Sequence, residues 1–258
     1  PRSTLFPYTT LFRSYFEVAG RLTVPGNLGT PGARNSRAVN NAPPAVYEVA
    51  HSPVLPAGGQ AVVVTARIHD AGGIASAALK YRIDPNTSYT TVTMVDTGVS
   101  GDAIAGDGLY SASIPAQSSG ALAAFLVTAT DTSGAARLYP TNSPANGRMR
   151  ECLVRFGDPT TFSGFGTYRM WFTQGTVNDW INRPIMSNEP EEGTFVYGNF
   201  RAIHSFGCRY AGSPWHQSWG SPLSDTHYTA SMPADNQLLG TTGFNKIHAP
   251  GNRSEEHT

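Results

Sequence analysis

The chain has 258 residues, of which 14% are charged, and its 18 basic and 18 acidic residues give a formal net charge of zero. A neutral chain offers no bulk electrostatic attraction to nucleic acid or to an anionic membrane, so we expect no nucleic-acid partner. No apolar run in the sequence approaches the length of a membrane-spanning helix, so we also expect no membrane span in this chain. The low charge, together with 27 glycines and 19 prolines, favours turn-rich β structure over a helix bundle.

The two ends of the chain differ in character from its interior. Residues 4–14 read TLFPYTTLFRS, and residues 253–258 read RSEEHT. Both strings resemble in-frame translations of sequencing adapters; the alternative is a genuine apolar strand at one end and a charged tail at the other. We therefore expect residues 1–14 and 253–258 to be adapter-derived and exclude them from the fold prediction. On this expectation the chain is a fragment of a longer gene product.

Residues 15–41 combine a short apolar stretch with a segment that breaks regular structure. Tyr15–Leu22 has the composition of a last strand, and the residues after it are rich in Gly, Pro and Asn. The string GTPGARNS resembles the close of a lamin-tail-type β domain, and a plain linker explains the same residues. We expect residues 15–41 to be the end of a preceding lamin-tail-like domain followed by a linker.

Residues 42–140 show the alternation of half-buried strands. In the run Ala61–Asp70, apolar residues occupy one face and mostly polar residues the other. Similar runs recur at residues 79–83, 92–94 and 110–114, and residues 121–129 are apolar on both faces, as in a central strand. Short strands at regular spacing, separated by turns rich in Asp and Gly, predict a mainly β chain. Its first domain, residues 42–140, should be a seven-strand immunoglobulin-like (Ig-like) β-sandwich.

One loop of this domain carries three carboxylates, Asp96, Asp102 and Asp107, among four glycines. Flexible loops rich in oxygen ligands suit calcium, so these three residues are a candidate calcium site. Asp and Gly also make tight turns unaided, through bonds from side chain to backbone and through positive φ angles. The spacing does not fit the twelve-residue EF-hand loop, and the sequence leaves both interpretations open.

Residues 147–252 predict a second set of strands with one helix. Residues 151–156, 167–172, 228–232 and 238–248 have strand character, and Phe195–Cys208 reads as a hairpin around a Gly198-Asn199 turn. Thr173 is placed to cap a short helix that turns Val177 and Trp180 inward. These elements predict a small mixed sheet with one helix beside it.

Cysteines and histidines give weaker signals in this region. Cys152 and Cys208 permit an extracellular disulfide, but two buried free thiols are the favoured prediction, since spacing alone does not set the geometry of a disulfide. The histidine spacings match no zinc-ligand pattern, and we predict no zinc site among them: His204, His216, His227 and His248.

Four strings in residues 147–252 resemble stretches of the CotH-type spore-coat protein kinases: TYRMWFTQGTVNDW, NEPEEGTFVYGN, RYAGSPWH and LLGTTGFNKIHAPGN. The resemblance implies that residues 147–252 are part of a CotH-like domain, an incomplete α+β kinase-like amino-terminal lobe. It further implies ATP with Mg or Mn as cofactors, a protein substrate rich in Ser and Thr, and an extracellular or cell-surface location. Catalytic acids would lie downstream of Asn252, so the fragment itself should be inactive.

The same resemblance suggests which residues would bind nucleotide phosphates. Arg209, Gly212 and Ser213 match the RxRGNS turn of the family, and Lys246 lies in the LLGxxxFNK segment. Two departures are visible: Ala211 replaces the second arginine of the turn, and the lysine-rich strand that usually follows lacks lysine here. Without the resemblance, Arg209 would pair with a carboxylate, Gly212 would serve the turn and Lys246 would lie at the surface.

Two other functions follow from the same residues. A structural or adhesive surface protein with a degenerate kinase-like domain is the main alternative to a kinase. Carbohydrate stacking on an aromatic cluster is a weaker one, because aromatic side chains more often pack over a loop: Tyr210, Trp215 and Trp219.

Overall fold

The structure is a computed structural model that describes residues 39–99, 101–143, 147–160, 167–182, 187, 189–210 and 227–248. The chain divides into two compact units, residues 1–42 and 43–258. The expected adapter-derived ends and the expected strand Tyr15–Leu22 lie outside the described residues. All elements below belong to the second unit.

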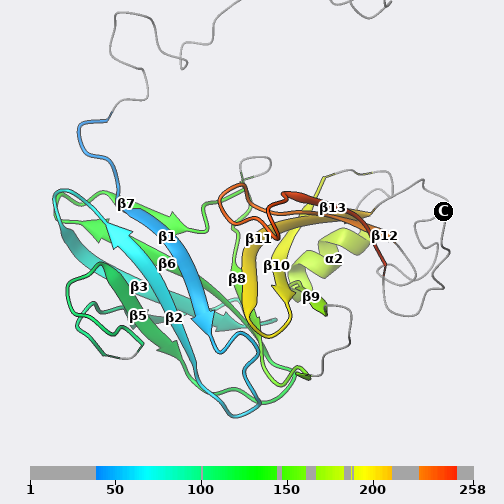
Figure 1. The fold of residues 1–258 in the computed structure, drawn as a ribbon. Coiled ribbons are helices and arrows are strands. Elements are labelled where there is room, and N and C mark those ends of the chain that lie inside the picture. The colour runs from blue at the N-terminus through cyan, green and yellow to red at the C-terminus, as the bar shows by residue number, and fades with distance from the viewer. Residues whose placement is uncertain are drawn as a thin grey trace, which may run out of the picture. The chain divides into compact units, whose positions relative to one another are not determined.

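Two antiparallel sheets form the sandwich that the alternation predicts (Figure 1). One sheet has the order β1-β2-β5, with β1 at Ala45–Ser52, β2 at Val62–His69 and β5 at Leu109–Ile114. The other has the order β4-β3-β6-β7, with β4 at Thr90–Thr93, β3 at Ile74–Ile83, β6 at Leu122–Asp131 and β7 at Ala136–Tyr139. The first, second and fifth strands oppose the rest, as in immunoglobulin domains, so the Ig-like sandwich is confirmed.

The sandwich core follows from the sequence pattern. Val62, Val64 and Ala66 on β2 are fully buried, whereas the residues between them are partly exposed. On β6 the whole run Ala123–Val127 is buried, which fits a strand covered on both faces. The predicted central strand is therefore central in the structure.

Strand β8, Cys152–Arg155, is placed differently from the expectation. The sequence assigned this strand to the second region, but it pairs with β6 from Leu122 to Phe125, while β7 pairs with β6 from Val127 to Thr130. Because β3 follows the other edge of β6 along its length, β7 and β8 share one edge in succession. The start of a second domain at residue 147 stays a prediction, but its first strand lies in the sandwich sheet.

A further five-stranded sheet follows within the described residues, in the order β13-β12-β11-β10-β9. Its strands are β9 at Tyr168–Trp171, β10 at Glu191–Tyr197, β11 at Arg201–Tyr210, β12 at His227–Ser231 and β13 at Gly243–His248. Every neighbouring pair is antiparallel, so the expected mixed sheet is wrong. The mainly β class is confirmed, whereas this architecture does not establish a kinase-like lobe.

Helix α2, Gln174–Asn182, covers one face of this sheet (Figure 1). Thr173 caps it as predicted, because its Oγ1 accepts a hydrogen bond from the Thr176 backbone N–H at 3.1 Å. Trp180 is buried against Phe172, Tyr210 and Tyr228. Within the described residues no helix is long and apolar enough to cross a membrane.

The opposite face of the sheet contributes to the core of the sandwich. Trp171 of β9 and Val196 of β10 are buried in the same apolar cluster as Phe125 and Leu153, with Ala202 of β11 packed against it. Phe195, Ile203 and Phe206 belong instead to the cluster under α2. Cys152 and Cys208 are buried free thiols, one in each cluster, and this confirms the favoured prediction.

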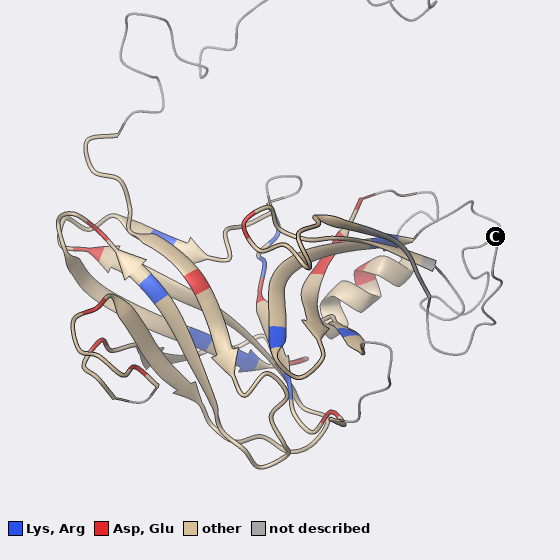
Figure 2. Cartoon of the chain, in the orientation of Figure 1, with Lys and Arg blue, Asp and Glu red and all other residues tan. Residues whose placement is uncertain are grey.

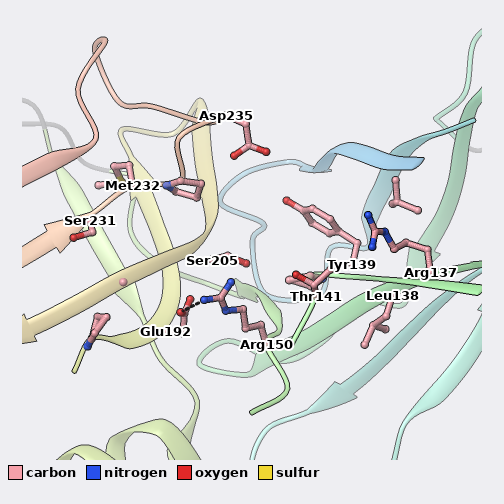
Figure 3. A pocket seen from close by; sticks show the side chains of 15 residues that line it. Arg137, Leu138, Tyr139, Thr141, Arg150, Glu192, Ser205, Ser231, Met232 and Asp235 are labelled. Carbon is pink, nitrogen blue, oxygen red and sulfur yellow. Dashed lines mark hydrogen bonds and ion pairs between the residues drawn. The ribbon is translucent and has the colours of Figure 1, made fainter. Parts of the chain in front are cut away.

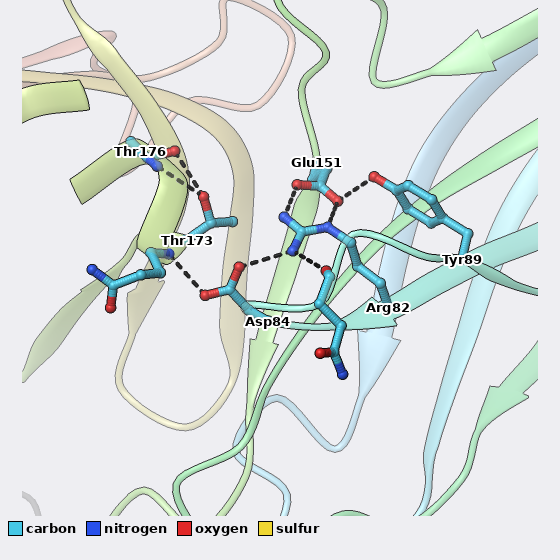
Figure 4. Close-up of polar contacts among 8 residues, drawn as sticks. Arg82, Asp84, Tyr89, Glu151, Thr173 and Thr176 are labelled. Atoms are coloured by element: carbon cyan, nitrogen blue, oxygen red, sulfur yellow. Dashed lines mark hydrogen bonds and ion pairs between the residues drawn. The ribbon is translucent and has the colours of Figure 1, made fainter. Parts of the chain in front are cut away.

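A nearly buried ion-pair network joins the sandwich to α2 (Figure 4). Arg82 at the end of β3 donates two hydrogen bonds to Glu151, at 2.7 and 2.5 Å, and one to Asp84 at 2.8 Å. The side chains of Arg82, Asp84 and Glu151 are each about one tenth exposed. The second oxygen of Asp84 accepts the backbone N–H of Gln174, the first residue of α2, where a negative charge is favourable. Hydrogen bonding to Glu151 raises the pKa of Arg82, so the guanidinium stays charged.

A buried hydrogen-bond chain makes a second connection, between β8, β10, β11 and β1. The Nε2 of His51 lies 3.2 Å from the Val54 carbonyl, which only accepts, so this nitrogen carries the proton. In a neutral His51 ring Nδ1 then accepts from His204 Nε2 at 3.4 Å. The Nδ1 of His204 accepts from Thr194 Oγ1 at 3.1 Å, and this oxygen accepts the Leu153 backbone N–H at 2.9 Å. The geometry thus assigns both histidine tautomers.

Both histidines are held neutral by their surroundings. The rings pack on Phe125, and His51 also lies near Trp171. Burial lowers the pKa of His51 from 6.5 to about 4, and burial and the neighbouring His51 lower that of His204. A proton on either ring would turn an acceptor of the chain into a donor that faces another donor.

The stability of the fold should therefore fall in mild acid. The unfolded chain takes up a proton on His51 below about pH 6.5, and the folded chain resists it until about pH 4, so the free energy of unfolding drops as pH falls through this window. His51 alone should account for about 3 kcal/mol between pH 7 and pH 4, measured by urea unfolding. In His51→Gln the amide can donate to Val54 and accept from His204 without titrating. Between pH 7 and pH 4 this variant should therefore lose about 3 kcal/mol less free energy of unfolding than the unaltered protein.

His69, which is exposed at the end of β2, supplies the matched control. His69→Gln leaves the buried hydrogen bonds of His51 and His204 in place, so it should keep the acid sensitivity of the unaltered protein. If His51→Gln loses as much stability in acid as His69→Gln does, the neutral histidine chain is not what makes the fold acid-sensitive.

Candidate functional site

The predicted phosphate-binding residues lie in the sheet β9–β13 or beyond the described residues. Arg209 is on β11, half-buried and opposite Thr229 of β12. It alternates with buried Cys208 and Tyr210, so it lies on the face opposite α2. Lys246 is on β13, which β12 separates from β11, and its side chain lies outside what the structure describes. Gly212 and Ser213 also lie outside, so this site stays a prediction.

Of the three residues in the predicted aromatic cluster, the structure describes Tyr210. Tyr210 is buried and packs against Trp180 and Tyr228 under α2. Trp215 and Trp219 lie outside the described residues. The described part of the cluster therefore packs as core and offers no ring face for a sugar.

Figure 2 shows acidic positions along the loop between β4 and β5, and the side chains of three aspartates come together there. Carboxylate oxygens of Asp96, Asp102 and Asp107 all lie within 4.8 Å of one another. Asp102 is buried, Asp96 is partly buried and Asp107 is exposed. This spacing suits a single cation held by oxygen ligands.

The same carboxylates also make the turns of the loop. Asp96 accepts the backbone N–H groups of Gly106 and Gly108 at 2.7 and 2.9 Å. Asp102 accepts those of Gly98 and Ile104 at 2.6 and 3.0 Å. Both interpretations that the sequence left open are thus compatible with the geometry, because an aspartate oxygen has lone pairs for an amide and a cation together.

A polar cleft lies elsewhere, where the chain leaves β7 and returns to β8 (Figure 3). Its volume is about 470 Å³, and it runs between β7 of the sandwich and strands β10–β12. We call it the β7 cleft. Its principal polar residues come from both sides: Arg137, Tyr139, Arg150, Glu192, Ser205 and Asp235.

Ser205 reaches this cleft through an irregularity in β11. Gly193 of β10 pairs with Phe206 and the next residue, Thr194, pairs with His204, so Ser205 has no partner across the ladder. This is a β-bulge, and Ser205 adopts φ 57°, a left-handed conformation that non-glycine residues rarely take. The bulge directs His204 toward the sandwich and Ser205 into the cleft.

Arg150 and Glu192 form the charged wall of the β7 cleft. Arg150 Nη2 lies 2.6 Å from Glu192 Oε1, and both side chains are about one quarter exposed. Burial raises the pKa of Glu192, although Arg150 opposes the rise. On the other side, burial raises the pKa of Tyr139, and the nearby carboxylate of Asp235 adds to it, so the phenol keeps its proton.

The spacing of apolar residues along β11 is the one sequence feature that indicates this cleft. The buried residues Ile203, Phe206 and Cys208 of β11 are spaced by three and then by two, and a step of three within a strand marks an extra residue. No local pattern indicated that Arg150 and Glu192 would meet across forty-two positions.

Part of the sandwich is similar to a known domain family. Residues 57–143 match the family model of the Conditioned medium factor 2nd Ig-like domain. The match lies within the sandwich and ends before β8, so it gives no support to a kinase-like assignment for residues 147–252. Comparison with curated proteins finds no match.

Among solved structures, this chain is similar to the cycloalternan-degrading enzyme from Trueperella pyogenes. The alignment covers 74% of this chain and 20% of that protein, at 10% identity and a TM-score of 0.27. The chain thus spans about a fifth of that enzyme's length. A similarity at this score carries no argument about the fold or the activity of this chain.

If the β4–β5 loop binds calcium, millimolar calcium should raise the melting temperature of the chain. In Asp102→Asn the increase should disappear, because one of the three ligand charges is gone. Magnesium is the control cation, since its demand for octahedral geometry suits this loop poorly. A melting temperature that calcium leaves unchanged assigns the three carboxylates to the turns alone.

Proposed function

We propose that the chain is part of a secreted or cell-surface multidomain protein in which the Ig-like sandwich and the sheet behind it act as one rigid structural module. The observation that supports this is the shared core: Trp171 and Val196 of the second sheet are buried in the same cluster as the sandwich strands. The family match of residues 57–143 to an Ig-like domain supports the structural role.

A rigid module needs connections that do not slide. The neutral histidine chain and the Arg82 network are hydrogen-bonded and therefore directional, so they fix the orientation of the second sheet as well as its distance. Apolar packing alone would allow small shifts between the two parts. A module built this way can hold a neighbouring domain at a constant angle from a surface.

This role requires that the two parts unfold together. Calorimetry should show one cooperative transition for residues of the sandwich and the second sheet. Glu151→Gln removes one of the two carboxylate charges that Arg82 faces, so we expect it to lower the free energy of unfolding by about 2 kcal/mol. Glu48→Gln removes a surface partner of Arg67 and should change it by less than about 0.5 kcal/mol.

Two well-separated transitions would contradict the rigid module. Equal effects of Glu151→Gln and Glu48→Gln on the free energy of unfolding would also contradict it, because the buried network would then stabilise the module no more than a surface ion pair does.

A finer proposal is that the longer protein is a CotH-like protein kinase. The resemblance of residues 147–252 supports it, and so does the position of Arg209 near the end of β11, three positions before Gly212 in the sequence. Under this proposal Arg209 and Lys246, from strands on either side of β12, act on the phosphates of ATP with Mg or Mn.

The gene product extended past Asn252 tests the kinase proposal. With ATP, Mg or Mn and a Ser/Thr-rich protein it should transfer phosphate, and Arg209→Ala should weaken nucleotide binding at least about tenfold. Arg67→Ala, in the sandwich, is the control and should bind nucleotide normally. If there is no phosphate transfer and both variants bind nucleotide equally, the kinase proposal is rejected and only the structural role remains.

A further inference from the structure

The β7 cleft has the properties of a ligand site that the structural role does not explain. It opens at the interruption between β7 and β8, where the outer edge of β6 changes partner. A volume of about 470 Å³ lies within the range of small-molecule sites. Prolines 140, 190 and 233 and Met232 supply apolar surface between the polar groups.

Three polar atoms in the cleft residues are buried and have no hydrogen-bond partner among the described residues: Arg150 Nε, Glu192 Oε2 and Ser205 Oγ. The ion pair of Arg150 and Glu192 uses one nitrogen and one oxygen, so the Nε–H donor of Arg150 and the Oε2 acceptor of Glu192 are left without partners among the described residues. Leaving such groups unpaired costs about 1–3 kcal/mol each, which a bound ligand with hydrogen-bonding groups would recover.

The conformation of Ser205 supports the same conclusion. Its left-handed backbone is strained, and serine gains nothing there that glycine would not supply without strain. What serine adds is the hydroxyl, which lies in the cleft and has no described partner (Figure 3). Strain retained with a free polar group is a property of functional positions.

We propose that the β7 cleft binds a neutral sugar. The hydroxyl groups of a pyranose both donate and accept, so one hydroxyl can accept from Arg150 Nε–H while it donates to Glu192 Oε2. A second can pair with the Ser205 hydroxyl. The C–H face of the ring packs on flat apolar surface, which the proline rings and Tyr139 provide.

The charges of the cleft argue against other ligand classes. Arg137 and Arg150 balance Glu192 and Asp235, so an anion such as phosphate would be repelled by the carboxylates and a cation by the arginines. An extended peptide would need a long row of free backbone groups, and β7 has only four residues. A neutral ligand with many hydroxyls matches the mixed side-chain lining.

Saturation-transfer NMR on the full chain tests the proposal, with glucose, galactose, mannose and N-acetylglucosamine each at millimolar concentration. At least one sugar should show transfer, and Ser205→Gly should weaken its binding about fivefold, the effect of one neutral hydrogen bond. The melting temperature of Ser205→Gly should not fall, because glycine relieves the strain at φ 57°.

Leu239→Gly is the matched control. Leu239 has φ 51°, is 75% exposed and does not line the cleft, so the substitution relieves similar strain without touching the site. It should bind sugar normally. The proposal is overturned if none of the four sugars binds or if Ser205→Gly binds as well as Leu239→Gly. Binding of inorganic phosphate or tri-alanine in the cleft, with no sugar bound, would also overturn it.

Discussion

The structure depends on β8 being paired in the sandwich while its neighbours bond to the next sheet. Leu153 lies in β8, beside β6, and its N–H donates outward to Thr194 of β10. A buried backbone N–H must find an acceptor, so the strand cannot stay in place unless β10 also does. Thr194 in turn donates to His204, His204 donates to His51, and His51 donates to the Val54 carbonyl, so each buried polar group depends on the next one being in place. The order of the sheets is therefore set by polar groups that have only one way to be satisfied.

This chain of hydrogen bonds explains why the bulge at Ser205 is needed. In a regular β11, Phe206 and His204 would point to the same face, because residues two apart share a face. Phe206 belongs to the core under α2, whereas His204 is bonded toward the sandwich. One extra residue between them reconciles the two demands, and the strain falls on Ser205. The polar connection and the strained residue are thus two consequences of one irregularity.

Sequence patterns predicted the strands well and their partners poorly, for a physical reason. Burial of one face leaves period-two alternation along each strand, so β2, β6 and the β10–β11 hairpin could be predicted locally. Which edge a strand joins depends on residues far away in the chain, and nothing within Cys152–Arg155 shows that it pairs with Leu122–Phe125. The aspartate loop could be found because Asp96, Asp102 and Asp107 lie close in sequence. The β7 cleft joins residues from five strands and three loops, and only the broken spacing around Ser205 marks it.

The cleft also follows from how the outer edge of β6 is filled. One strand continuing from β7 to β8 would leave no opening, but the chain departs at Pro140 and returns at Arg150. The departure exposes the side chains of Arg137 and Tyr139, and the return brings Arg150 to Glu192 on the next sheet. Because β8 must come back to the same edge, the two sides of the opening are held by the strands that fix the core. A site formed in this way is rigid without having any regular structure of its own, which is the condition for selecting a ligand by the placement of its hydroxyl groups.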